Sequence, residues 1–301
     1  MKHATLFILM LAVTAALLIA GCTQQQQPVQ QTLPPAAPPT AVPAADTVIA
    51  AASPLGTILT DAQGKTLYYF ANDRPDSGAS ACSGQCAAIW PAFSAGTVHV
   101  SSPLDPADFG SITRGDGTKQ TTYYGWPLYY YQADANPGDV KGDGVLGIWY
   151  VFRPDESVLV AHTAALGSYL TDTSGKTLYV FTKDTAGTTS CSGTCLAKWP
   201  AFGPDYPLKV PSSLNLADFV PLARTDNVTQ TAYKGKPLYY YSGDNMPGDT
   251  NGQGFNNLWY VANVSGIVPV VTTVPTTVPT TVPTTNYAAS YGGSSSSGGG
   301  Y

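Results

Sequence analysis

Apolar and aromatic residues occur along this 301-residue chain in short runs separated by Gly, Pro, Asp and Asn. In the run Pro-Leu-Tyr-Tyr-Tyr at 127–131, strand alternation places the leucine and the second tyrosine on one face and the other two tyrosines on the opposite face. Both faces are apolar or aromatic, as they are in Leu-Tyr-Val-Phe at 178–181. Such strands are covered on both sides, as in packed sheets or a small barrel. Helical periodicity is confined to a turn or two at 82–90 and its copy.

The chain repeats itself at two levels. Leu-Gly-Thr-Ile-Leu-Thr-Asp at 55–61 returns as Leu-Gly-Ser-Tyr-Leu-Thr-Asp at 166–172, and Trp-Pro-Ala-Phe at 90–93 returns at 199–202. Within each half, a fainter motif, Tyr-x4-Asp, occurs twice at the end of a Leu-Tyr-rich strand, and its aspartates are expected to cap the strand ends. The four copies are Tyr68/Asp73, Tyr129/Asp134, Tyr179/Asp184 and Tyr239/Asp244.

These repeats predict an all-β protein with two tandem, pseudo-symmetric domains of short antiparallel strands, each a small sandwich or barrel. The domains are expected at 54–153 and 165–264, joined by a linker at 154–164. Identity between the halves far exceeds identity within a half, which is typical of duplication of an already folded unit. The alternative is a single four-bladed propeller, because each motif spans about 50 residues, near the size of one blade.

The N-terminus predicts export and lipidation. Residues 1–21 form a secretory signal, with an apolar run too short to span a bilayer. The sequence Ile-Ala-Gly-Cys ends this segment and resembles a bacterial-type lipobox, so Cys22 is expected to carry the lipid. Residues 22–53 are rich in Gln, Pro and Ala and are expected to form a tether. The protein is therefore expected outside the cytoplasm, anchored in a membrane at the cell surface.

A second low-complexity segment follows the repeats at 265–301, where Val-Pro-Thr-Thr repeats predict a stalk and Gly and Ser predict a disordered tail. Asn227 and Asn263 each begin a glycosylation sequon, which matters only in a host that glycosylates. The whole chain has 14 basic and 19 acidic side chains and a formal net charge of −5. No basic patch occurs, which disfavours nucleic acid as a partner.

The motif set from about residue 54 to 264 closely resembles the family of secreted lipoprotein repeats of unknown function. The resemblance is carried by the lipobox, the Gly-Lys-Thr-Leu-Tyr-x-Phe run, Cys-x3-Cys before Trp-Pro, and Tyr-x4-Asp in every motif. It implies location and repeat number and brings no catalytic residue. One departure is Lys236, which stands where the first half has Trp126. We expect Trp126 to be a rim residue able to stack on a ligand, and the second half to lack that site.

The cysteines of the repeats come in two closely spaced pairs, Cys82/Cys86 and Cys191/Cys195. In an oxidising compartment this spacing predicts two local disulfides. A five-residue loop has little closure entropy to remove, so each is expected to contribute roughly 2 kcal/mol. The alternatives are a thiol–disulfide redox pair, which needs a depressed thiol pKa, and a zinc site shared by all four cysteines.

Cofactor chemistry is disfavoured because His99, His162 and Met246 have no counterparts in the other half, so haem, blue copper and hydrolytic triads lack repeated ligands. The Asp/Gly loops are faintly similar to calcium loops, but the closing glutamate is missing and Lys141 stands at a ligand position. Turn capping explains the same side chains better. The weak calcium candidates are Asp139, Asp143, Asp249 and Asn251.

Two functions remain open at this point. The first is a tethered, non-enzymatic envelope protein with a structural role or a binding role toward an envelope glycan or a surface protein, and without a cofactor. The second is an accessory to extracytoplasmic redox or electron transfer through the Cys-x3-Cys pairs.

Overall fold

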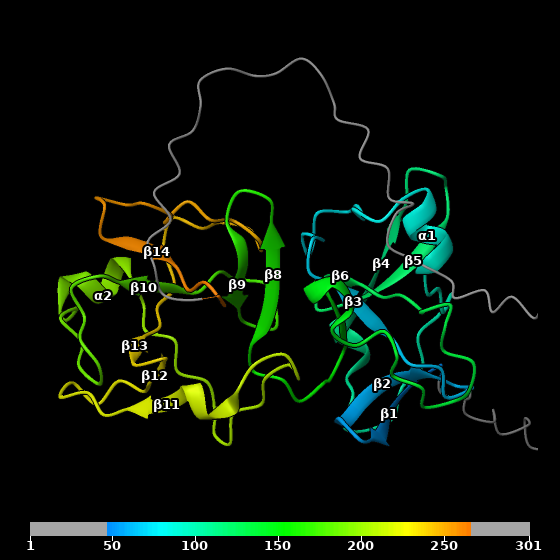
Figure 1. Cartoon of the computed structure of the whole chain (residues 1–301), viewed down its shortest axis with the longest axis horizontal. Coiled ribbons are helices and arrows are strands. Elements are labelled where there is room, and N and C mark those ends of the chain that lie inside the picture. Colours follow the sequence, from blue (N-terminus) through cyan, green and yellow to red (C-terminus); the bar gives the residue numbers. More distant parts are fainter. Residues whose placement is uncertain (1–46, 266–301) are drawn as a thin grey trace, which may run out of the picture. The chain divides into compact units, whose positions relative to one another are not determined.

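Short antiparallel strands are the main regular secondary structure of residues 47–265, the part of the chain that the computed structural model describes (Figure 1). The segments expected to be the signal, the stalk and the tail, most of the expected tether, and the lipidation site Cys22 lie outside this range. Inside it, no helix combines the length and apolar character needed to cross a bilayer. The sequence prediction of an all-β protein is confirmed.

The elements of the first half follow one another from blue to green in Figure 1. They are β1 (Val48–Ser53), β2 (Gly56–Asp61), β3 (Tyr68–Phe70), α1 (Gln85–Ile89), η1 (Pro106–Asp108), β4 (Phe109–Thr113), β5 (Lys119–Tyr123), β6 (Trp126–Pro127), η2 (Val145–Gly147) and β7 (Trp149–Val151).

The second half repeats this order with one 3-10 turn fewer. Its elements are β8 (Leu159–Thr163), β9 (Gly167–Thr171), β10 (Tyr179–Phe181), α2 (Thr194–Lys198), η3 (Leu216–Asp218), β11 (Phe219–Leu222), β12 (Gln230–Tyr233), β13 (Lys236–Pro237) and β14 (Trp259–Val261).

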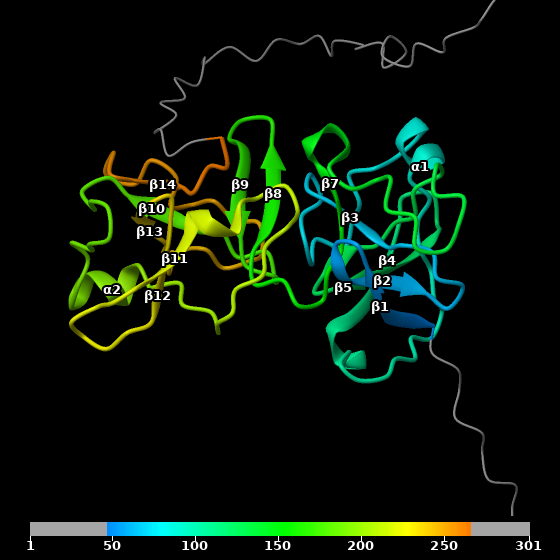
Figure 2. The ribbon, with the colours of Figure 1, turned by 60° about the horizontal axis from the view of Figure 1, so that its bottom comes forward.

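Each half contains the same three small sheets. The first half pairs β1 with β2, β3 with β7, and β4 with β5 and β6, and the second half pairs β8 with β9, β10 with β14, and β11 with β12 and β13, all antiparallel. The hairpin of β8 and β9 is clear in both ribbon views (Figures 1 and 2). The described sheets have two or three strands and none closes into a barrel, so the four-stranded blades of a propeller are absent from residues 47–265.

Two strands lie where the sequence predicted none. β1 falls in the segment expected to end the tether, and β8 falls in the expected linker 154–164. Both are the outer strands of hairpins, so each half begins one strand earlier than the sequence indicated. The division into two domains at 54–153 and 165–264 stays a prediction.

The two halves share buried surface. The main hydrophobic cluster contains Tyr69 and Trp126 of the first half together with Leu159 and Tyr169 of the second. The amide of Val160 donates to the Tyr69 hydroxyl at 3.2 Å across this boundary. A smaller separate cluster lies wholly in the first half and contains Tyr68, Phe70, Cys82, Trp90, Tyr129 and Trp149.

The Pro-Leu-Tyr-Tyr-Tyr segment at 127–131 pairs with β3 and so brings the two motifs of the first half together. Tyr68 and Tyr129 exchange two backbone hydrogen bonds of 2.9 Å, as Tyr179 and Tyr239 do in the second half at 2.8 and 3.0 Å. The strand ends of both motifs therefore meet at one place, where the site described below is formed.

Candidate functional site

The Tyr-x4-Asp motifs are joined in reciprocal pairs within each half. The Tyr68 hydroxyl donates to Asp134 Oδ2 at 2.6 Å, and the Tyr129 hydroxyl donates to Asp73 Oδ2 at 2.5 Å. Each motif therefore gives its tyrosine to the aspartate of the other motif. The second half repeats the exchange in the pairs Tyr179–Asp244 at 2.7 Å and Tyr239–Asp184 at 2.6 Å.

The other carboxylate oxygen of each aspartate holds the loop that follows the strand. Asp73 Oδ1 accepts from the amide of Ala81 at 2.6 Å, and Asp134 Oδ1 accepts from the amide of Lys141 at 3.0 Å. The aspartates therefore cap as expected, but each accepts from a backbone amide seven or eight positions further along the chain. Burial raises the pKa of Asp73 to about 6, although its hydrogen bonds from Tyr129 and Ala81 act to lower it.

A column of four aromatic rings lies beside these pairs. In the first half the column runs Tyr131, Trp90, Trp149, Phe70, with successive ring centroids 4.2, 3.8 and 4.1 Å apart. The two indoles are parallel within 1°. A Cβ on Gly142 would lie 2.8 Å from atoms of Trp90, so only glycine allows the loop to approach the column so closely. The second half has the same column in Tyr241, Trp199, Trp259 and Phe181, with distances of 4.4, 3.8 and 4.3 Å.

The expected disulfides are present next to the ring columns. Cys82 is bonded to Cys86 and Cys191 to Cys195, with Cα atoms 5.3 Å apart in each pair. The second cysteine of each pair lies in the one-turn helix, α1 or α2, that leads to the tryptophan of the Trp-Pro motif. Each bond therefore closes the loop that carries the first indole of the column.

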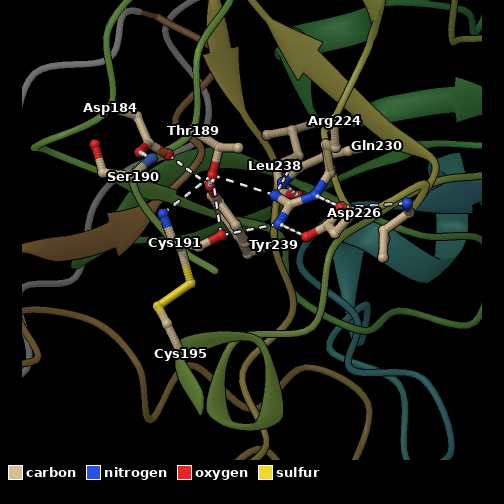
Figure 3. A network of polar contacts seen from close by, with 11 residues as sticks. Asp184, Thr189, Ser190, Cys191, Cys195, Arg224, Asp226, Gln230, Leu238 and Tyr239 are labelled. Carbon is tan, nitrogen blue, oxygen red and sulfur yellow. Dashed lines mark hydrogen bonds and ion pairs between the residues drawn. A yellow bond between two sulfur atoms is a disulfide. The ribbon is translucent and has the colours of Figure 1, made fainter. Parts of the chain in front are cut away.

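A buried arginine organises each disulfide loop. Figure 3 shows Arg224 donating to the Cys191 carbonyl at 2.9 Å and to Gln230 Oε1 at 2.7 Å, with an ion pair to Asp226 at 2.6 Å. The hydrogen bond from Arg224 lowers the pKa of Asp226 to about 2.

The first half repeats this arrangement. Arg114 donates to Gln120 Oε1 at 2.6 Å and to the Cys82 carbonyl. The sequence interpretation missed these arginines. Their signal was available, because Arg-x-Asp followed by Gln six positions after the arginine occurs at the same place in both halves.

The first half has a cavity of about 360 Å³ at the side of its ring column. Trp90 and Trp149 line it, together with Cys86 of the disulfide loop. Its polar lining is Asn72, Ser83 and Gln85, and its further apolar lining is Phe70, Ala81, Ile89, Val145, Leu146 and Ile148. No side chain that lines this cavity carries a charge.

The second half carries larger or charged side chains at the corresponding positions. Phe255 replaces Val145 and packs edge-on against Trp199 at 5.7 Å between ring centroids. Lys198 replaces Ile89, and its Nζ lies 4.0 Å from the centroid of the Phe255 ring. The place of the first-half cavity is therefore occupied by the protein's own side chains. A different cavity of about 390 Å³ in this half is lined by Lys176, Thr177, Pro200, Tyr240, Tyr241, Ser242 and Asp244.

Leu146 at the mouth of the first-half cavity is in an unfavourable conformation. It is 64% exposed and has φ of 54°, a left-handed backbone that leucine adopts at a cost. The second half has Asn256 there with φ of 52°, and asparagine tolerates this region well. An exposed, strained apolar residue beside a cavity is typical of a functional site.

The prediction that Trp126 lies at a rim is wrong. Its ring is fully buried, 5.2 Å from the ring of Tyr69, and its Nε1 donates to the carbonyl of Thr173 at 3.0 Å. Thr173 belongs to the second half, so the repeat pattern of the first half alone gave no sign of this cover. Lys236 at the equivalent position is half-buried and donates to the Asp184 carbonyl.

The weak calcium candidates are engaged in hydrogen bonds and ion pairs with other groups of the protein. Asp139 Oδ2 accepts from two amides of its own loop and pairs with Lys141 Nζ at 2.7 Å, while Asp249 pairs with Arg74 at 2.7 Å. Asp143 Oδ1 accepts from the Val151 amide at 3.0 Å. In residues 47–265 no group of three or more His, Cys, Asp or Glu side chains is arranged to hold a metal ion. The remaining candidate, Asn251, donates its side-chain amide to the Gly243 carbonyl at 3.1 Å.

The other predicted residues lie apart from the ring columns. Asn227 is exposed in a loop between β11 and β12, whereas the Asn263 side chain donates to the Leu166 carbonyl at 2.7 Å. His162 Nδ1 lies 3.1 Å from Ser168 Oγ, and the Thr47 hydroxyl donates to the His99 carbonyl at 3.3 Å.

Comparison with known proteins identifies the repeat. The model of a family described as a secreted repeat of unknown function matches residues 50–94, 110–153, 160–202 and 222–263. These four matches cover more than half of the chain, so the chain belongs to this family, as its motifs suggested. No curated protein and no solved structure matches significantly.

Proposed function

We propose that this member of the secreted repeat family is a lipid-anchored, non-enzymatic binding protein of the cell surface, whose first half binds an aromatic side chain of a partner protein. The family places the chain outside the cytoplasm. The observation that carries the binding role is the uncharged cavity beside Trp90 and Trp149, which the second half fills with Phe255.

The lining of the cavity supports an uncharged apolar ring as the bound group. Ligand sites are mostly apolar with a few polar groups that fix orientation, and Asn72, Ser83 and Gln85 supply such groups here. A volume of about 360 Å³ is at the lower end of the range of about 300–1,000 Å³ seen for ligand cavities, which suits one side chain better than a glycan. Leu146 extends apolar surface outside the cavity, where a protein partner would cover it.

The direct test uses p-cresol, the analogue of a tyrosine side chain, with the full chain observed by NMR. The indole N–H signals of Trp90 and Trp149 should shift on titration, while those of Trp199 and Trp259 should not. Val145→Phe should abolish the shifts, because it copies the residue that occupies this place in the second half. Val220→Phe is the matched control, since Val220 is 45% exposed on β11 and outside the cavity. Unchanged shifts in Val145→Phe would overturn the proposal.

Lipid anchoring has its own test. Cys22→Ser should release the protein from the membrane fraction without altering its unfolding transition, because the repeats begin well after this residue. Retention of the variant at the wild-type level would exclude lipidation at Cys22.

A redox role of the Cys-x3-Cys pairs is the second candidate, and one structural observation favours it. Arg114 and Arg224 donate to the carbonyls of Cys82 and Cys191, and a nearby guanidinium lowers the pKa of a thiol. Thiol titration of the native protein after mild reductant tests it. Rapid, reversible appearance of two thiols per half would support thiol–disulfide exchange, and resistance until unfolding would contradict it.

A further inference from the structure

The two indoles of each ring column lie closer than packing alone favours. Trp90 and Trp149 are parallel with centroids 3.8 Å apart, and Trp199 and Trp259 repeat this within 2° at the same distance. Aromatic pairs in proteins usually prefer offset or edge-on geometries with centroids about 4.5–7 Å apart. A close parallel pair is, however, the arrangement in which two rings share the charge of a radical cation.

A tyrosine paired with a carboxylate stands at the edge of each indole. Tyr129 meets Trp149 at 5.1 Å and 90°, and its hydroxyl donates to Asp73 Oδ2 at 2.5 Å. Tyr68 meets Trp90 at 5.4 Å and donates to Asp134 Oδ2 at 2.6 Å. A phenol hydrogen-bonded to a base loses an electron readily, because its proton can move to the base in the same step.

We propose that the first-half column is a one-electron donor that quenches oxygen-centred radicals, such as peroxyl radicals, at the cell surface. The radical takes an electron from Trp149 and a proton from solvent and becomes a hydroperoxide. The resulting hole is shared between Trp149 and Trp90. An electron from Tyr129 fills it while the phenolic proton moves to Asp73. The balance is ROO• plus H⁺ plus Tyr129–OH plus Asp73–COO⁻, giving ROOH plus Tyr129–O• plus Asp73–COOH.

Access and burial fit this order of steps. Both indoles line the cavity, so a small oxidant reaches them there, whereas Tyr68 and Tyr129 are completely buried. A radical formed on Tyr129 is thus shielded from other molecules. In the second half Phe255 packs against Trp199, so the column there is less accessible to an oxidant. This activity requires no bound partner, and a partner's ring bound in the cavity would block the same path to the indoles.

The test is photochemical oxidation of the full chain by a ruthenium(III) tris-bipyridine complex, followed by transient absorption and EPR spectroscopy. The wild type should form a tryptophan radical that decays as a neutral tyrosyl radical appears. A variant with four substitutions keeps the rings and removes only the hydroxyls: Tyr68→Phe, Tyr129→Phe, Tyr179→Phe and Tyr239→Phe. In this variant the tryptophan radical should be long-lived. Tyr206→Phe is the matched control, because it removes a hydroxyl that lies 2.8 Å from Thr231 Oγ1 and away from the ring columns, and it should leave the radical kinetics unchanged.

A second variant separates electron donation from folding. Asp73→Asn, checked for a native unfolding transition, should slow the appearance of the tyrosyl radical and reduce its solvent isotope effect, because the asparagine cannot accept the proton. The proposal is overturned if the tyrosyl radical persists without the four hydroxyls, if it disappears in Tyr206→Phe, or if Asp73→Asn leaves its rate unchanged.

Discussion

The two halves keep the same ring column and the same Tyr–Asp exchange, yet they differ at the side of the column. The first half has Ile89, Val145 and Leu146 around an open cavity, and the second half has Lys198, Phe255 and Asn256 at the equivalent places. The first-half column also forms a hydrophobic cluster of its own, whereas the second-half column belongs to the main core. The ring column and the Tyr–Asp exchange are therefore common to both halves, whereas the cavity lined by Ile89, Val145 and Leu146 belongs to the first half.

The largest expected difference concerns the position where the halves carry Trp126 and Lys236. Trp126→Ala should destabilise the protein by about 3–5 kcal/mol, because it leaves a cavity among fully buried rings. Lys236→Ala should cost about 1 kcal/mol, since it removes one hydrogen bond from a half-buried chain. Urea unfolding of both variants measures this, and a small loss for Trp126→Ala would contradict its burial.

Stability should increase as the pH falls from neutral toward about 5. Burial raises the pKa of Asp73 to about 6. Burial also raises the pKa of Glu156, which lies in the segment before β8 and outside both ring columns. A raised carboxyl pKa means that the folded state binds more protons, so this stability is present below the unfolded pKa and is lost as the pH rises through the folded pKa. At about 1.4 kcal/mol per pKa unit, the whole shift of Asp73 corresponds to about 3 kcal/mol, which is reached only below its unfolded pKa, so only part of it is gained by about pH 5.

Glu156→Gln is the control for the pH dependence. Neither oxygen of Glu156 has a hydrogen-bond partner, and the nearest cation, Arg153, lies 3.4 Å away. The neutral variant should be more stable than wild type at pH 7.5 and should show a shallower loss of stability with rising pH. A steeper loss, or higher wild-type stability at neutral pH than at pH 5, would refute this account of the buried carboxyls.

Loss of one phenolic hydroxyl should cost the same in either half. Tyr129→Phe and Tyr239→Phe each leave a buried carboxylate, Asp73 or Asp184, short of one hydrogen bond, which costs about 1–3 kcal/mol. Chemical denaturation of the two variants compares them directly. Unequal costs would show that the exchange has a different role in each half.

The smallest expected effect is a gain. Leu146→Asn copies Asn256 and should stabilise the protein by about 1 kcal/mol, because asparagine tolerates a positive φ better than leucine does. The same variant should weaken partner binding, since it removes exposed apolar surface at the cavity mouth. A loss of stability would mean that Leu146 contributes packing that its 64% exposure does not indicate.

Local patterns predicted the elements of the fold well and their long-range contacts poorly. Alternating aromatic runs indicated covered strands, and the spacing of Cys82 and Cys86 indicated a local disulfide, because both depend on neighbours in sequence. The exchange between Tyr68 and Asp134 was not predicted, since it depends on how residues 127–131 return against β3.

Comparison of the halves also misled the interpretation of one residue. The presence of Lys236 at the position equivalent to Trp126 suggested that this position is exposed. In the first half, however, the Trp126 ring is in contact with Thr173 of the second half, whose carbonyl accepts from its Nε1. In the sequence the cavity corresponds only to three differences between the halves, one of them Val145 against Phe255. Only the fold shows that these three positions lie around one cavity.

The most direct test of the difference between the halves is to exchange their cavity residues and titrate each variant with p-cresol. The pair Phe255→Val and Lys198→Ile should open the second half, so that the indole N–H signals of Trp199 and Trp259 shift on titration. Val145→Phe should remove the shifts of Trp90 and Trp149. If p-cresol instead shifts the indole signals of both halves alike in the wild type, or of neither, the first half does not carry the binding site.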